Sequence, residues 1–252
     1  MPQNFDADVA VIGYGPTGVV GALTLAQQGA SVLALERDRD IYPRARAVTV
    51  NDWTMRIFQG LGIGARVEKV IDPQRALRWV TYDGDEVMRI EHPPSTLGSG
   101  PRFYNIYQPT MESELRACAQ DRSELISVRY GAEVTEIEQD DSGVTLTTTD
   151  TATGEVTRYR TRYAVAADGG SSATRQRLGI PLLGDTGETT WVVIDCRSSA
   201  GGPTATSSPS GRTRNARSST SPCRPATTAG RSRSSLTRPR PTSRPPPRCG
   251  RC

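Results

Sequence analysis

Apolar residues follow two different spacings at the start of the chain. A short run from Val9 to Ile12 leads into the stretch GYGPTG, and apolar residues then recur at helical intervals from Val19 to Leu25. A second apolar run, LALE, ends at Glu36. The pattern predicts a strand, a glycine turn, an amphipathic helix and a second strand, in that order.

Two later segments also have the character of strands. The stretch YAVAADG contains the apolar run Ala164–Ala167, which predicts an interior strand that ends at Asp168. The stretch TTWVVIDC, which begins at Thr189, alternates like a strand with Trp191 on its apolar face. Together with the first elements, these strands predict an α/β fold of the doubly wound, Rossmann type.

The chain changes character at Ser198. Residues 198–252 contain eleven Arg and no Asp, Glu or Lys, so the net charge of +4 arises in this tail, and residues 1–197 carry a balance of −7. The tail has almost no apolar side chains to bury, and we predict that it is disordered. It could be a natural basic linker. We favour a shifted reading frame, because GC-rich DNA that is read out of frame gives mostly Arg, Pro, Ala, Gly, Ser and Thr.

Three glycines of the first turn have the spacing of a dinucleotide-binding loop. Gly13 allows a tight turn, Gly15 lets the backbone approach a pyrophosphate, and Gly18 permits close packing of the helix on the strand. The N-terminus of the helix offers unpaired N–H groups to the phosphates. Glu36 ends the second strand, where its carboxylate can accept hydrogen bonds from an adenosine ribose. The spacing predicts dinucleotide binding and leaves FAD and NAD both open.

Three further stretches, in order after the glycine turn, carry a family resemblance. They are IYPRARAVTVNDWTMRIFQGLGI, FYNIYQPTMESELR and YAVAADGGSSATRQRLGI. With the glycine turn they resemble the FAD-dependent aromatic-ring hydroxylases, the single-component flavin monooxygenases, and among them the subgroup that hydroxylates 3-(3-hydroxyphenyl)propionate. The resemblance extends from about Asp6 to about Cys196.

The resemblance also implies a division into domains. Residues 1–180 would form the FAD-binding domain, with part of a mainly β substrate sheet inserted at about 77–107. Residues 181–197 would begin a truncated substrate domain, and residues 198–252 would form the disordered tail.

The family's cofactor contacts can be carried over to matching positions. Arg46 matches an arginine near the flavin, and Arg44 competes for that role because the register of PRARA is ambiguous. Gln108 matches a glutamine that contacts FAD at the head of a helix. The stretch DGGSSATR matches the DG motif, which helps to bind FAD and the nicotinamide nucleotide; it supplies Asp168, Gly169, Gly170, Ser172 and Arg175. The implied FAD-binding residues are Gly13, Gly15, Gly18, Glu36, Arg46, Gln108, Asp168 and Gly169.

Each of these positions also has a purely structural interpretation. The two arginines could be solvated loop cations, and the glutamine could simply begin a helix. The pair Asp168-Gly169 could be an ordinary turn after a strand. The lone histidine, His92, is predicted to be an exposed loop residue with no catalytic role.

The resemblance implies a reaction in which NAD(P)H reduces the flavin, O₂ reacts with it, and one oxygen atom is transferred to a phenolic ring. The family continues with a GDAAH-type segment that contacts FAD. This sequence lacks that segment, since Gly184-Asp185 is not followed by Ala-Ala-His. We therefore expect a truncated and inactive form of a hydroxylase, with no assigned catalytic side chain and no metal site.

The same residues leave two other functions open. An FAD-dependent oxidoreductase outside the hydroxylases stays open, as does a polyanion-binding protein that acts through its Arg-rich tail. The tail has no aromatic side chain for base stacking, which disfavours nucleic acid as a partner. No apolar run approaches the roughly 18 residues needed to cross a bilayer, and no charged leader precedes the first run. These features predict a cytoplasmic protein that uses FAD, NAD(P)H, O₂ and a small phenolic substrate.

Overall fold

Strand β1 (Ala7–Ile12) and helix α1 (Pro16–Gln27) form from the apolar run and the helical spacing on either side of the glycine turn. The computed structural model describes residues 4–43, 47–81, 85–98 and 100–184, with two short strands at 196–197 and 215–216. The other described helices are α2 (Asp52–Gly60), α3 (Gly64–Val67), η1 (Glu68–Val70), α4 (Gln108–Gln120) and α5 (Ala173–Arg177). The other described strands are β2 (Val32–Glu36), β3 (Thr49–Asn51), β4 (Asp72–Gln74), β5 (Ala76–Val80), β6 (Glu86–Glu91), β7 (Phe103–Asn105), β8 (Ile126–Tyr130), β9 (Ala132–Asp140), β10 (Gly143–Asp150), β11 (Val156–Ala166), β12 (Cys196–Arg197) and β13 (Asn215–Ala216).

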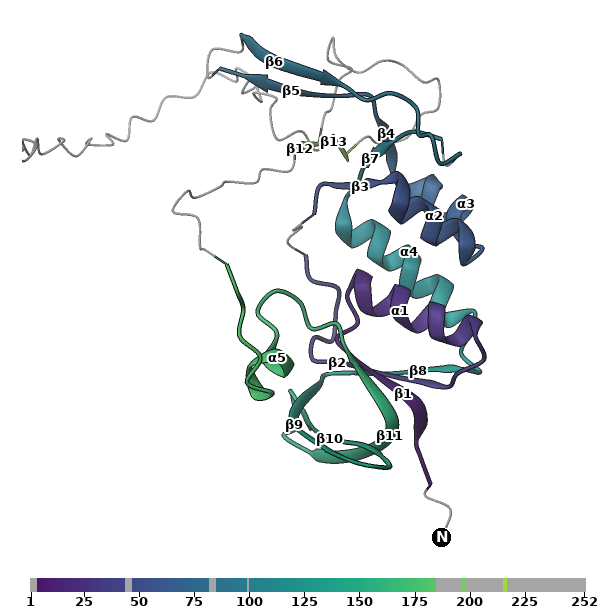
Figure 1. The fold of residues 1–252 in the computed structure, drawn as a ribbon, viewed down its shortest axis with the longest axis vertical. Coiled ribbons are helices and arrows are strands. Elements are labelled where there is room, and N and C mark those ends of the chain that lie inside the picture. The colour runs from purple at the N-terminus through teal and green to yellow at the C-terminus, as the bar shows by residue number, and fades with distance from the viewer. Residues whose placement is uncertain are drawn as a thin grey trace, which may run out of the picture. The chain divides into compact units, whose positions relative to one another are not determined.

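Six of the described strands form one sheet in the order β8-β2-β1-β11-β10-β9. Strand β1 pairs in parallel with β2 on one side and with β11 on the other, so Val11 lies between Ala34 and Val165. Strand β8 extends the parallel part, and β10 and β9 are antiparallel. The chain builds outward from β1 through β2 to β8 and returns on the opposite side of β1 (Figure 1). The predicted α/β fold of the Rossmann type is confirmed.

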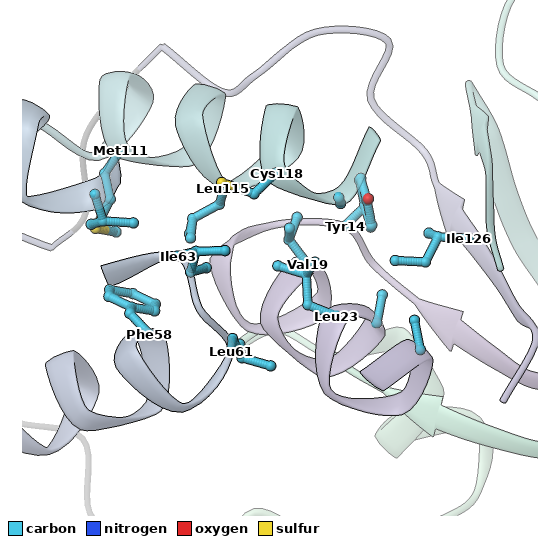
Figure 2. Packing of buried hydrophobic residues seen from close by; sticks show 14 of the residues in the cluster. Tyr14, Val19, Leu23, Phe58, Leu61, Ile63, Met111, Leu115, Cys118 and Ile126 are labelled. Atoms are coloured by element: carbon cyan, nitrogen blue, oxygen red, sulfur yellow. The ribbon is translucent and has the colours of Figure 1, made fainter. Parts of the chain in front are cut away.

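Helices α1, α2 and α4 share the larger hydrophobic core, on one side of this sheet (Figure 2). Val19 and Leu23 of α1 and Leu115 of α4 are completely buried in it, and Phe58 of α2 is almost so. A fully buried side chain of this size stabilises the fold by roughly 1.5–3 kcal/mol. This helix layer therefore fixes α1, and with it the glycine turn at the end of β1.

Strands instead of helices cover the other face of β1 and β2 in the described part of the chain. Ala10 and Ile12 of β1 and Leu35 of β2 pack with Val134 of β9 and Leu146 of β10. The sheet therefore curls back on itself beyond β11, as Figure 1 shows.

Two small sheets form in the connection between β2 and α4. Strands β3, β7 and β4 pair in that order, and β5 and β6 form an antiparallel hairpin in which every β6 residue is exposed. Strands β5, β6 and β7 overlap the range of about 77–107 in which the inserted part of a substrate sheet is predicted, whereas β3 and β4 precede it. That domain assignment stays a prediction.

Several predictions concern residues outside the described ranges. These are Arg44 and Arg46, Asp185, most of the strand predicted from Thr189, and the tail 198–252 apart from β13. Strand β13 pairs with β12 in antiparallel orientation. Among the described residues, no helix combines the length and the apolar character that a membrane span requires.

Candidate functional site

The glycine turn between β1 and α1 has a shape that two of its glycines make possible. Gly13 has a φ of 91°, and a Cβ atom there would lie 2.7 Å from the carbonyl oxygen of Ala167. A Cβ atom at Gly18 would lie 2.0 Å from the carbonyl oxygen of Gly13 and 3.4 Å from the side chain of Val11. Gly18 therefore allows the start of α1 to pack closely against the glycine turn and against β1.

Gly15 differs from these two glycines, because a Cβ atom there would have no neighbouring heavy atom within 4 Å. Its φ of −71° and ψ of −174° are available to other residues, so neither backbone strain nor packing explains a glycine here. Gly15 is the N-cap of α1, and no side chain caps this helix. The open space therefore lies at the positive end of a helix dipole, where unpaired N–H groups can bind a phosphate.

The carboxylate of Glu36 is held at the same end of the sheet. Glu36 is the last residue of β2 and is 8% exposed. Its Oε2 accepts a 2.6 Å hydrogen bond from the Tyr14 N–H in the turn, and its Oε1 accepts a 2.9 Å bond from the Asp38 N–H. These bonds fix both oxygens beside the turn and leave further lone pairs for a ligand hydroxyl.

The segment after β11 lies against the glycine turn. Because β11 runs parallel to β1, the strands end together at Ala166 and Ile12. The Ala167 N–H donates to the Ile12 carbonyl at 2.8 Å, and a Cβ atom on Gly13 would lie 3.0 Å from the Cα of Asp168. The two predicted motifs therefore meet beside β1, where the strand order changes direction, and open α/β sheets bind ligands at this point.

Asp168 organises the loop that leads into α5. Its Oδ1 accepts a 2.5 Å hydrogen bond from the Ser172 hydroxyl, and its Oδ2 accepts a 2.9 Å bond from the Thr174 N–H. Burial raises the pKa of Asp168, but the hydrogen bonds from Ser172 and Thr174 outweigh it and hold the pKa below its usual value. Asp168 therefore has the structural role that the sequence left open, and its contact with FAD stays a prediction.

The other residues matched to the DG motif also have structural contacts. Ser172 caps α5, because its Oγ accepts a 2.9 Å hydrogen bond from the Arg175 N–H. The guanidinium of Arg175 donates to the Ile180 carbonyl at 2.9 Å. Gly169 has a φ of 83°, as a turn glycine requires, and a Cβ atom on Gly170 would have no neighbour within 4 Å.

Gln108 begins α4, as predicted, and its side chain reaches the segment before β3. Its Oε1 accepts a 3.2 Å hydrogen bond from the Ala47 N–H. Ala47 directly follows Arg46, which lies outside the described residues. The bond therefore links two predicted FAD-binding segments, although contact of either with FAD stays a prediction.

The sequence did not predict two of the hydrogen-bond donors in this site. Tyr14 and Thr174 contribute backbone N–H groups, which no side-chain pattern marks.

The prediction that His92 is exposed was wrong. Its side chain is half-buried, because its ring centroid lies 4.5 Å from that of Phe103. Burial and the nearby Arg102 lower the pKa of His92. No group of three or more His, Cys, Asp or Glu in the described ranges is placed to hold a metal ion.

These contacts fit the adenosine diphosphate half of FAD. A phosphate can approach the backbone at Gly15, because a Cβ atom there would have no neighbouring heavy atom within 4 Å. The Glu36 carboxylate stands beside the same turn with free lone pairs for a ribose. The residues present therefore match the chemistry of the group that the sequence predicts.

Comparisons with known proteins identify the family of the chain. The family model described as FAD binding domain matches residues 6–238. A 3-(3-hydroxy-phenyl)propionate/3-hydroxycinnamic acid hydroxylase of Burkholderia vietnamiensis (strain G4 / LMG 22486) is 36% identical over 196 residues, which cover 78% of this chain and 31% of the relative. A "probable NADH-specific resorcinol 4-hydroxylase" of Rhodococcus jostii (strain RHA1) is 34% identical over 188 residues, which cover 75% of this chain and 35% of the relative.

Solved structures show the same fold. The flavin-dependent monooxygenase PieE, in complex with FAD and substrate, matches with a TM-score of 0.62 at 28% identity over 77% of this chain and 34% of PieE. The p-nitrophenol 4-monooxygenase PnpA from Pseudomonas putida DLL-E4 has a TM-score of 0.64 at 21% identity, over 77% of this chain and 47% of PnpA. The chain spans about a third of the length of the two curated relatives. It belongs to the FAD binding domain family, and the predicted resemblance to the FAD-dependent aromatic-ring hydroxylases is confirmed.

Proposed function

We propose that the sheet edge at the ends of β1, β2 and β11 binds the adenosine diphosphate half of FAD. The open space beside Gly15, at the uncapped N-terminus of α1, carries this proposal. A pyrophosphate there would accept hydrogen bonds from the first N–H groups of the helix. Glu36 would accept a hydrogen bond from a ribose hydroxyl, which suits a ribose without a 2′-phosphate.

The other site residues hold this edge in shape. Gly13 and Gly18 allow the turn to close on β1, and Asp168 holds the adjoining loop through its bonds to Ser172 and Thr174. The Gln108 side chain binds the segment before β3 to α4. We propose that Arg46 or Arg44, in the residues directly before Ala47, contacts the flavin. The bound flavin would supply the redox chemistry, because it can accept electrons from NAD(P)H and activate O₂.

For the complete reaction we propose NAD(P)H-dependent hydroxylation of a phenolic ring. The names of the two curated relatives support this substrate class, since 3-(3-hydroxyphenyl)propionate and resorcinol both carry a hydroxyl group meta to a second substituent. Because this chain spans about a third of their length, we propose that its residues supply the FAD-binding part and do not hydroxylate alone. Neither relative supports a polyanion-binding function.

The proposed site is tested by titrating the purified chain with FAD and measuring binding through the quenching of flavin fluorescence. Glu36→Gln should weaken FAD binding by about tenfold, because one acceptor oxygen becomes an NH₂ group that faces a backbone N–H donor. Glu114→Gln is the matched control, since Glu114 pairs with Arg66 at 2.6 Å, away from the turn. Equal FAD affinity in Glu36→Gln and in the unmodified chain would contradict the ribose assignment.

A further inference from the structure

Tyr14 occupies the variable position of the glycine turn, yet its side chain is buried. The residue is 1% exposed. Figure 2 shows its ring beside the C-terminal half of α4, close to Ile126. A dinucleotide-binding turn requires only backbone groups at this position. The buried ring therefore serves to anchor the turn to the helix layer.

Arg116 of α4 contacts this ring and a second one. Its guanidinium carbon lies 5.6 Å from the ring centroid of Tyr14 and 5.2 Å from that of Tyr130. The two rings meet edge to face, with their centroids 6.1 Å apart. A guanidinium within about 6 Å of a ring centroid is attracted by the ring quadrupole. Arg116 therefore holds the ring of the turn against the ring at the end of β8.

Glu112, one helical turn earlier in α4, fixes the position of Arg116. Its Oε1 accepts a 2.6 Å hydrogen bond from Arg116 Nη2, and the two side chains are 4% and 13% exposed. A cavity of about 420 Å³ beside Tyr14, Arg116 and Tyr130 offers the guanidinium room to move. The buried ion pair prevents this movement, since an unpaired carboxylate would remain if Arg116 moved away.

The contacts continue through the Tyr14 backbone to the proposed ribose ligand. The Tyr14 N–H donates to Glu36 Oε2 at 2.6 Å in a buried position. Burial raises the pKa of Tyr14, with a further contribution from Tyr130, so the phenol stays neutral and Arg116 interacts with an uncharged ring. Because the buried ring anchors the backbone of Tyr14, a shift of the whole residue would displace this N–H and, with it, the carboxylate.

We infer that Arg116 and Glu112 are positioning residues for FAD binding, which act through Tyr14 on the phosphate turn and on Glu36. The inference rests on the proposed function, because Glu36 is the proposed ribose ligand. It also gives α4 two roles toward one cofactor. Gln108 anchors the Ala47 segment at the start of the helix, and Arg116 anchors the turn two helical turns later.

Two measurements on the full chain test this inference: FAD affinity, and the ¹⁵N NMR signal of the Tyr14 amide. Arg116→Met should weaken FAD binding by about tenfold and shift the Tyr14 amide signal, because the ring is released. Adding Glu112→Gln removes the unpaired carboxylate and should restore stability without restoring affinity. Arg116→Lys keeps the charge but loses the planar group, so it should bind FAD with intermediate affinity and keeps the test open if the Met variant does not fold.

Arg122→Met is the matched control. The Arg122 guanidinium holds the carbonyls of Leu23 and Leu61 at 3.2 and 2.9 Å, so its loss should lower stability but leave FAD affinity and the Tyr14 amide signal unchanged. If the unmodified chain binds FAD and the Arg116 variants bind it equally well, the inference is wrong and the proposed function stands. If the unmodified chain does not bind FAD, the proposed function is wrong and the inference fails with it.

Discussion

Two glycines of the same turn differ in what surrounds them. A Cβ atom on Gly18 would lie 2.0 Å from a backbone oxygen, whereas one on Gly15 would meet no atom within 4 Å. A side chain at Gly18 therefore disturbs the protein itself, and a side chain at Gly15 occupies only the space proposed for the pyrophosphate.

Gly18→Ala should consequently destabilise the fold. Forcing an atom into this contact should lower the free energy of unfolding by at least about 2 kcal/mol, because the neighbouring atom is backbone and cannot move aside. Gly21→Ala, in the same helix, is the control: its Cβ would have no neighbour within 4 Å. That control should gain up to about 1 kcal/mol from helix propensity. Urea unfolding measures both changes, and similar stability in the two variants would contradict the packing role of Gly18.

The lowered pKa of Asp168 predicts a stability difference that depends on pH. A carboxyl group whose pKa is lowered by folding stabilises the folded protein at pH values above its unfolded pKa of about 3.9. This stabilisation is lost as the pH falls through the pKa of the folded state. Asp168→Asn should therefore lower the free energy of unfolding at pH 7. The loss should be only about 1 kcal/mol, because the site is partly exposed. The difference from the unmodified chain should shrink below about pH 4. A difference that is independent of pH would contradict this account.

For single residues, the sequence predicts the features that depend on residue type and spacing. These are the glycine turn, Glu36 and the DG pair. It does not predict that Glu36 is held by the amides of Tyr14 and Asp38, because backbone groups carry no sequence signal. The ion pair of Glu112 and Arg116 has a recognisable spacing of four residues on a helix. Its contact with two rings depends on tertiary packing and cannot be predicted from that spacing.

Among the elements, the core strands and α1 follow from apolar periodicity. The covering of the second sheet face does not, because β9 and β10 pair with each other locally but pack on β1 and β2 through long-range contacts that local spacing leaves open. Helix α4 is less apolar than α1, and a charged residue, Glu112, lies on its buried face. The sequence therefore predicts where α4 begins better than what it contacts.

Packing between α1 and α4 should determine most of the stability of the helix layer. Leu115→Ala removes a completely buried side chain of α4 and should lower the free energy of unfolding by about 2–5 kcal/mol. Leu183→Ala is the control, because Leu183 is 88% exposed. The control should change stability by less than about 0.5 kcal/mol. Thermal unfolding compares the two, and equal losses would contradict the assignment of this core.

For the whole molecule, the composition of residues 198–252 supports our proposal of a shifted reading frame. Sequencing the gene across codons 195–201 should reveal a gained or lost base. The protein translated in the restored frame should then oxidise NADH or NADPH in the presence of a phenol, with one atom of ¹⁸O₂ in the product. An uninterrupted frame in the gene would contradict the proposal for the tail and leave the FAD site untouched.

The central claim is that the space beside Gly15 holds the pyrophosphate of FAD. The most direct test titrates the chain with FAD and with ADP, comparing the unmodified chain with Gly15→Val and with Gly21→Val as the control. We predict that both ligands bind, because the described contacts suit the half that they share, and that FAD binds more tightly, because an arginine next to the Gln108-linked segment is proposed to contact its flavin. Gly15→Val should abolish both interactions in a folded protein, while Gly21→Val should leave them unchanged. Undiminished FAD binding by folded Gly15→Val would contradict the account.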